Sequence, residues 1–111
     1  MNVLVTGGTG ALGREVVRDL RTSGHRARIF SRKSGTGADW VQGNLATGTG
    51  LDKALTDIEA VVHCATAARE PWRTRATDVN GTRRLLEAAA RAHIKHVAYI
   101  SVVGMERVDF P

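Results

Sequence analysis

The segment Thr6–Gly13 contains the pattern Gly-x-x-Gly-x-x-Gly, directly between an apolar run and an amphipathic stretch. Gly7 permits a tight turn, Gly10 lets the backbone approach a pyrophosphate, and Gly13 lets a following helix pack closely on the preceding strand. Backbone N–H groups at the start of such a helix bind an anion, assisted by the positive end of the helix dipole. Because strand, turn and helix follow in this order, the pattern predicts a pyrophosphate site rather than a merely flexible loop.

Ser31, Arg32 and Lys33 follow the second apolar run, at the place where a site for NAD carries an acid that binds the ribose 2′-hydroxyl. No acid occurs after that run until Asp39. A carboxylate there would repel a 2′-phosphate, whereas serine and arginine donate hydrogen bonds to it. The sequence therefore favours NADP over NAD as the cofactor. In the alternative interpretation, Arg32 and Lys33 are ordinary cations of a surface loop.

Short apolar runs alternate with amphipathic or glycine-rich segments along the chain. The expected strands are residues 2–6, 27–31, 40–42, 60–64 and 97–101. The expected helices are residues 11–23, 51–58 and 78–93, and the expected loops include residues 34–38 and 69–77. Gly24 is expected to stop the first of these helices. The apolar residues expected to face inward are Leu51, Leu55 and Ile58 from the second helix, and Leu85, Leu86, Ala89 and Ala90 from the last.

Strands that alternate with helices pair in parallel through right-handed crossovers. The pattern therefore predicts one α/β domain of the Rossmann type over residues 1–111. Its parallel sheet has about five strands in the order 3-2-1-4-5 and is flanked by helices in a three-layer arrangement. The ligand crevice is expected at the carboxyl ends of the first and fourth strands.

The chain of 111 residues is basic, with 16 lysines and arginines against 11 acids and a formal net charge of +5. A basic protein attracts phosphates, both those of nucleic acids and those of phosphorylated cofactors. The cations are spread along the chain, and aromatic residues make up only 5% of it, too few for a surface that stacks bases. The composition therefore favours a phosphorylated cofactor over nucleic acid as the partner.

Cys64 is the only cysteine, so the sequence predicts no internal disulfide and fits a reducing cytoplasm. A small buried apolar role is favoured for it over that of a catalytic thiol. No run approaches the ~18 consecutive apolar residues that span a bilayer, and a strand pattern directly after Met1 leaves no room for a signal peptide. We therefore expect a cytoplasmic protein without a membrane partner, and the sequence predicts no metal site.

Taken together, these segments resemble the short-chain dehydrogenase/reductase family, in its extended and atypical branches that include NmrA-like proteins. The matching segments are TGGTGALG at 6–13, SRK at 31–33, QGNL at 42–45, AVVHCATA at 60–67, DVNGTRRLLEAA at 78–89 and HVAYIS at 96–101. The first is specific by itself, and the ordered set covers essentially the whole chain.

The resemblance implies roles at the cofactor for several residues. The residues that would face the pyrophosphate are Thr9, Gly10, Ala11 and Leu12. Asn44 and Leu45 match the Asp-Leu pair that brackets the adenine, and the Asn44 amide can both donate and accept. The residues that would pass beneath the cofactor ribose are Cys64, Ala65 and Thr66. Ser101 stands where the family has its catalytic serine or threonine.

The catalytic Tyr-x-x-x-Lys of that family does not occur in this sequence, because Tyr99 is the only tyrosine and Val103 stands four positions later. Without that pair, nothing supplies the proton-transfer half of the reaction. The resemblance thus implies the NAD(P)-binding domain of an NADP-dependent oxidoreductase, shortened before its catalytic Tyr and Lys. Two alternatives stay open: a non-catalytic NmrA-like module that binds dinucleotides or senses redox state, and an unproductive remnant that folds poorly.

The last predicted strand lies within HVAYISVV at 96–103, a segment that is rich in β-forming residues, nearly uncharged and free of proline. A strand edge of this kind pairs with another strand unless something blocks it. We therefore expect the chain to associate with itself through the edge of this fifth strand.

Overall fold

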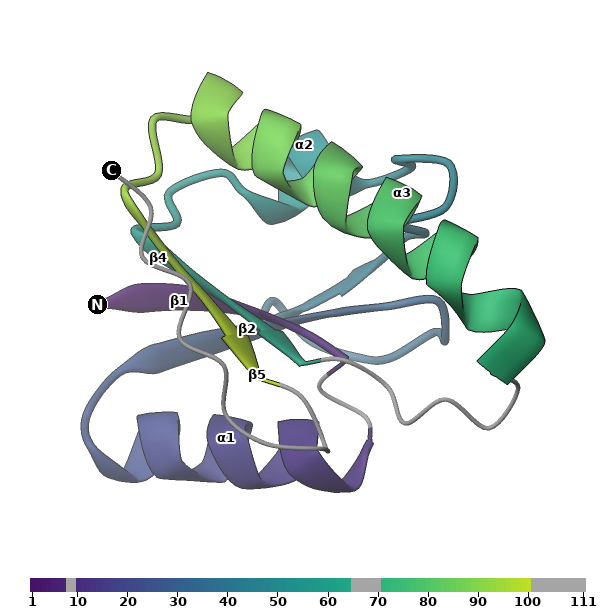
Figure 1. The fold of residues 1–111 in the computed structure, drawn as a ribbon. Helices are drawn as coiled ribbons and strands as arrows, with labels where there is room; N and C mark the ends of the chain where they lie inside the picture. The colour runs from purple at the N-terminus through teal and green to yellow at the C-terminus, as the bar shows by residue number, and fades with distance from the viewer. Residues whose placement is uncertain (8–9, 65–70, 101–111) are drawn as a thin grey trace.

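The computed structural model describes residues 1–7, 10–64 and 71–100, which form a parallel sheet covered by helices on both faces (Figure 1). The strands are β1 (Asn2–Thr6), β2 (Arg26–Ser31), β3 (Trp40–Gln42), β4 (Ala60–Cys64) and β5 (His96–Ile100). The helices are α1 (Ala11–Thr22), α2 (Leu51–Ala54) and α3 (Pro71–Arg91). The five strands pair in parallel in the order β3-β2-β1-β4-β5, which confirms the predicted fold class and strand order. Figure 1 shows α1 on one face of the sheet and α2 with α3 on the other.

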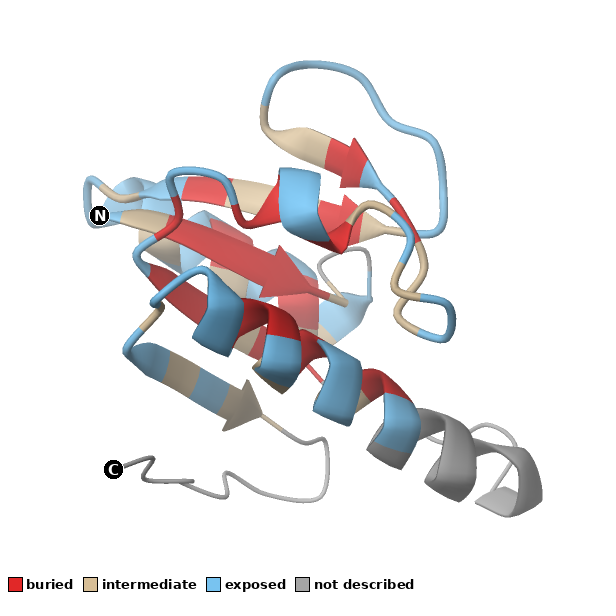
Figure 2. Ribbon diagram, turned by 90° about the horizontal axis from the view of Figure 1, so that it is seen from above, coloured by how far each residue is buried: buried red, intermediate tan, exposed pale blue. Residues whose placement is uncertain are grey.

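β1 occupies the centre of the sheet and is buried on both faces (Figure 2). Val3 and Val5 pack in one cluster with Val17 of α1. Leu4 points to the opposite face, where it packs in a second cluster with Leu85 of α3. A parallel strand covered on both faces needs apolar side chains at successive positions, which explains why β1 is a continuous apolar run.

Gly24 ends α1, as the sequence predicts. Its φ of 86° lies in the left-handed region that glycine adopts without strain. The backbone N–H of His25 donates to the Leu20 carbonyl at 2.9 Å, and the N–H of Gly24 donates to the Arg21 carbonyl at 3.1 Å. This pair of hydrogen bonds is a Schellman motif, which satisfies carbonyl groups of the last helical turn.

The prediction of a loop at residues 69–77 is wrong from residue 71 onward, because α3 begins at Pro71. Proline disrupts the interior of a helix, but it suits the first helical position. There its missing N–H has no helical partner to lose, and its fixed φ matches the helix. Pro71 therefore starts the helix rather than interrupting it, and the helix predicted at 78–93 begins earlier than expected.

The buried face of α3 also differs from the prediction at one position. Leu85 and Ala89 are buried as expected and Leu86 is half-buried, but Ala90 is exposed. Ala88 is buried instead. Positions three and four residues after Leu85 fall on its side of the helix, whereas a position five residues later turns away from it.

The second predicted helix, at 51–58, is shorter than expected. α2 spans Leu51–Ala54, and the chain changes direction at Asp57, whose φ is 61°. The residues expected to face inward, Leu51, Leu55 and Ile58, are nevertheless all buried. The apolar spacing therefore predicted the packing correctly, although the backbone does not continue as a helix.

Candidate functional site

The carboxyl ends of β1, β2 and β4 lie at the same edge of the sheet, because the strands are parallel and adjacent. Thr6, at the end of β1, is in register with Phe30 of β2 on one side and with His63 of β4 on the other. The glycine turn that begins at Gly7 and the basic turn at Ser31, Arg32 and Lys33 leave the sheet at this edge, where β4 ends at Cys64. Candidate site residues from distant parts of the sequence are thus brought together.

Gly7 turns the chain out of β1 with a φ of 74°, which agrees with the tight turn expected from the sequence. The neighbouring strand adds a second requirement. A Cβ atom placed on Gly7 would lie 2.4 Å from the carbonyl oxygen of Cys64, closer than real Cβ atoms approach any heavy atom. Only glycine therefore fits between the turn and the end of β4.

Gly10 is the N-cap residue of α1, and no side chain among the described residues caps this end of the helix. The first hydrogen bond of the helix is donated by the Arg14 N–H to the Gly10 carbonyl. The N–H groups of Ala11, Leu12 and Gly13 therefore have no acceptor within the helix. The first turn contains no acidic residue. A Cβ atom on Gly10 would meet a single described atom within 4 Å, a backbone oxygen 3.6 Å away. Among the described residues, nothing else fills the space on this side of the start of α1, which therefore suits an anion such as a pyrophosphate.

The basic turn after β2 carries positive charge that no acid in the described part of the chain neutralises. Arg32 and Lys33 are exposed, and neither forms an ion pair with a residue in the described ranges. The nearest following acid, Asp39, is paired with Arg26 at 2.8 Å. The Ser31 hydroxyl accepts the Lys33 backbone N–H at 3.1 Å, and its own proton can still be donated. These groups suit a phosphate ester better than a neutral hydroxyl.

Asn44 and Leu45 form part of a compact turn after β3. Asn44 Oδ1 accepts the Ala46 N–H at 2.9 Å, and the Asn44 N–H donates to the Thr49 carbonyl at 3.0 Å. Leu45 packs against the core and lies next to Gly81 of α3, where an added Cβ would be 3.3 Å from the Leu45 Cβ. Both residues hold this turn in place, and their contact with adenine stays a prediction.

Cys64 ends β4 beside the glycine turn and is only 4% exposed. Burial raises the pKa of its thiol, so the protonated form, which is a poor nucleophile, is favoured. This environment agrees with the small buried residue expected from the sequence. The other predicted site residues, Thr9, Ala65, Thr66 and Ser101, lie outside the described residues.

A buried polar pair that the sequence analysis missed lies beneath the site. Thr6 and His63 are 1% and 8% exposed, and Thr6 Oγ1 is 2.5 Å from His63 Nδ1. His63 Nε2 is 3.3 Å from Thr82 Oγ1 of α3, and the ring centroid of His63 is 5.3 Å from that of Tyr99 on β5. The pair therefore joins β1 to β4, and His63 also contacts α3 and β5. Polar residues inside apolar strands are the sequence signal for such a pair, because buried polar groups need partners.

The described residues contain neither a candidate metal site nor a helix suited to span a membrane. No group of three or more histidine, cysteine, aspartate and glutamate side chains among them could hold a metal ion. Nor does any helix in this part of the chain combine the length and apolar character needed to cross a membrane.

Comparison with known proteins identifies a family and a set of longer relatives. The NAD dependent epimerase/dehydratase family matches residues 3–105. A (4-alkanoyl-5-oxo-2,5-dihydrofuran-3-yl)methyl phosphate reductase of Streptomyces griseus is 34% identical, over 96% of this chain and 36% of the reductase. The photosystem II assembly factor Ycf39 of Synechocystis is 35% identical, over 93% of this chain and 34% of that protein.

A solved structure shows the same similarity in three dimensions. It is a short-chain dehydrogenase/reductase superfamily protein of Agrobacterium tumefaciens with bound NAD, 38% identical and superimposed with a TM-score of 0.73. The match covers 89% of this chain and 32% of that protein. The chain thus spans about a third of the length of the relatives it matches.

Proposed function

The chain belongs to the NAD dependent epimerase/dehydratase family, and from this premise we propose that it forms the cofactor-binding part of an NADP-dependent oxidoreductase of the short-chain dehydrogenase/reductase type. By fold and by family it is an NAD(P)-binding domain. The observation that carries the proposal is the glycine turn, where an open approach at Gly10 leads to N–H groups without helical acceptors. Arg32 and Lys33, which form no ion pair with any described residue, support the choice of NADP.

Each part of the site would hold one part of the dinucleotide. The pyrophosphate would lie against the turn and helix start formed by Gly7, Thr9, Gly10, Ala11, Leu12 and Gly13. The 2′-phosphate would be bound by Ser31, Arg32 and Lys33. The adenine would lie between Asn44 and Leu45, and the ribose above Cys64, Ala65 and Thr66. The bound cofactor supplies a hydride donor or acceptor, and Ser101 would orient a carbonyl group of the substrate.

The choice of cofactor gives a direct test. The chain is expected to bind NADP⁺ more than about tenfold more tightly than NAD⁺, because a charge-assisted phosphate contact contributes roughly 1.5–3 kcal/mol. Isothermal titration calorimetry with both cofactors measures the ratio. The double variant Arg32→Gln, Lys33→Gln is expected to lose most of the preference.

The matched control is Lys95→Gln, which removes an exposed cation just before β5, at the opposite end of the strands. It is expected to leave the preference unchanged. Equal affinities of the unaltered chain for the two cofactors, or tighter binding of NAD⁺, would contradict the choice of NADP.

A second candidate is a non-catalytic NmrA-like module that binds a dinucleotide or senses redox state. The observation in its favour is that one relative is an assembly factor by name, although it is as similar to this chain as the reductase is. Because the sequence lacks the Tyr-x-x-x-Lys pair, no turnover is expected from this chain by itself in an NADPH oxidation assay with small carbonyl compounds. Turnover by purified protein that disappears in Ser101→Ala would favour the oxidoreductase.

We also propose that the chain associates with itself through the outer edge of β5. Within the described sheet β5 pairs with β4 alone, and Ala98 on it is exposed. An unprotected strand edge of low charge offers its backbone groups to another strand. Light scattering over a concentration series is expected to show a mass that rises above the 11.9 kDa of one chain. A strictly monomeric species at high micromolar concentration would rule this association out.

A further inference from the structure

The basic turn after β2 is held in place by the adjacent strand. The Ser31 carbonyl accepts the Gly43 backbone N–H at 2.8 Å. The Arg32 carbonyl accepts the Gln42 side-chain amide at 3.1 Å. The Lys33 carbonyl accepts the indole N–H of Trp40 at 2.9 Å. Every carbonyl of the turn is therefore bonded to β3 or to the residue that follows it.

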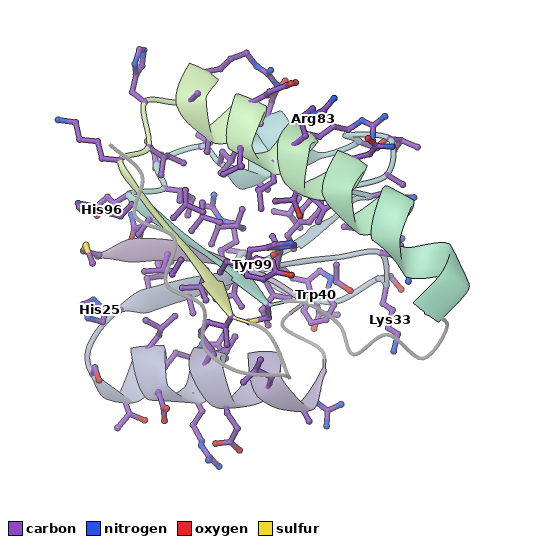
Figure 3. All side chains as sticks on the ribbon, viewed as in Figure 1. His25, Lys33, Trp40, Arg83, His96 and Tyr99 are labelled. Carbon is purple, nitrogen blue, oxygen red and sulfur yellow. The ribbon has the colours of Figure 1, made fainter. Side chains whose placement is uncertain are left out.

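Trp40 contributes more than its hydrogen bond. A Cβ atom placed on Gly35 would lie 2.1 Å from Cδ2 and 2.3 Å from Cε2 of the indole, so the ring lies directly against the Gly35 backbone. Trp40 thus contacts the segment both at the Lys33 carbonyl and at Gly35. Figure 3 labels Trp40 and Lys33, which come from β3 and from the end of the basic turn. Fixing both points restricts the backbone that carries the cationic side chains.

A fixed backbone matters here because Arg32 and Lys33 are exposed and have long side chains. Such side chains lose conformational entropy when they bind a ligand, and an unfixed backbone would add to that loss. We propose that Trp40 is a positioning residue that selects the 2′-phosphate of NADP by holding the Arg32–Lys33 backbone in its binding conformation. The inference rests on the proposed function, in which these cations contact that phosphate.

The test compares two probes that differ by one phosphate, 2′,5′-ADP and 5′-ADP, in calorimetric titrations of the full chain. Trp40→Ala is expected to weaken 2′,5′-ADP binding about tenfold, which corresponds to ordering roughly one more residue of backbone on binding. Binding of 5′-ADP is expected to change less than about twofold, because no phosphate of this probe reaches the turn. Trp40→Phe retains a ring against Gly35 but lacks the indole N–H. Its affinity for 2′,5′-ADP is therefore expected to lie between those of the unaltered chain and of Trp40→Ala.

Gly35→Ala tests the same contact from the other side, because its new methyl group displaces the indole. It is expected to reproduce the selective loss, whereas the control Thr36→Ala, at the adjacent exposed position, is expected to leave both affinities unchanged. Circular dichroism checks that each variant is folded. Where Trp40→Ala does not fold, Trp40→Phe and Gly35→Ala decide the result.

The possible failures are distinguishable. If the unaltered chain shows no preference for 2′,5′-ADP, then the proposed function is wrong in its choice of cofactor, and the role of Trp40 is overturned with it. If the unaltered chain prefers 2′,5′-ADP but the folded variants at residues 35 and 40 keep that preference, the inference alone is overturned. An equal loss of both probes also overturns it, because a general structural role does not select the phosphate.

Discussion

Gly10→Val is expected to abolish dinucleotide binding and to leave the sheet folded. The isopropyl group would occupy the space in front of the helix start, where a Cβ atom meets, among the described residues, only a backbone oxygen at 3.6 Å. The backbone at Gly10, with φ −77° and ψ 171°, is extended and accessible to valine. The cost to folding is therefore confined to a poorer N-cap, about 1 kcal/mol, which a typical stability of roughly 5–15 kcal/mol tolerates.

Calorimetry with NADP⁺ and circular dichroism on the same sample measure both parts of this expectation. The affinity is expected to fall by at least about a hundredfold, since the site loses its closest approach to the pyrophosphate. Ala90→Val places the same isopropyl side chain at an exposed position of α3 and is expected to leave binding unchanged. Unaltered affinity in a folded Gly10→Val protein would show that the glycine turn does not hold the cofactor.

Gly7→Ala is expected to destabilise the fold itself, by about 2–5 kcal/mol. Two costs combine at this position. Alanine is strained at a φ of 74°, which costs roughly 1–2 kcal/mol. Its methyl group would also lie 2.4 Å from the Cys64 carbonyl oxygen, and such overpacking costs typically 1–3 kcal/mol. Urea unfolding followed by circular dichroism measures the change in the free energy of unfolding.

Gly24→Ala is the matched control, because it separates the two costs. Gly24 has a similar φ of 86°, but a Cβ atom added there meets nothing within 4 Å among the described residues. Its substitution is therefore expected to lower the free energy of unfolding only by the strain of alanine at a positive φ, about 1–2 kcal/mol. Equal destabilisation by Gly7→Ala and Gly24→Ala would show that the turn moves away from β4 at little cost in free energy. It would contradict the close packing of Gly7 against Cys64.

The local backbone geometry of the candidate site could be predicted from the sequence because it depends on short segments. The glycine spacing at 6–13 predicted a turn before a helix, and the structure has a left-handed glycine and the start of α1 there. The fold class and strand order followed from the alternation of apolar runs and amphipathic segments. Both inferences depend on residues close in sequence, whose spacing reflects local geometry. The cofactor contacts proposed for these residues remain predictions.

The errors arose where one residue type supports two structures. Pro71 was interpreted as part of a loop, although proline also starts helices, and α3 begins there. Ala90 was expected to be buried because alanine is apolar, but its small side chain is compatible with either side of a helix. At both positions the packing of the whole element decided the outcome, not the residue type.

The sequence by itself determined the order of the elements, the glycine turn and the position of the basic turn, because each depends on neighbouring residues. The tertiary structure alone decided that Gly7 lies against Cys64, that Thr6 meets His63, and that Trp40 holds the Lys33 carbonyl. The first two contacts join residues 57 positions apart, and they form only once the strand order and register place β1 beside β4. Spacing along the chain describes local geometry, whereas such contacts depend on how distant segments pack.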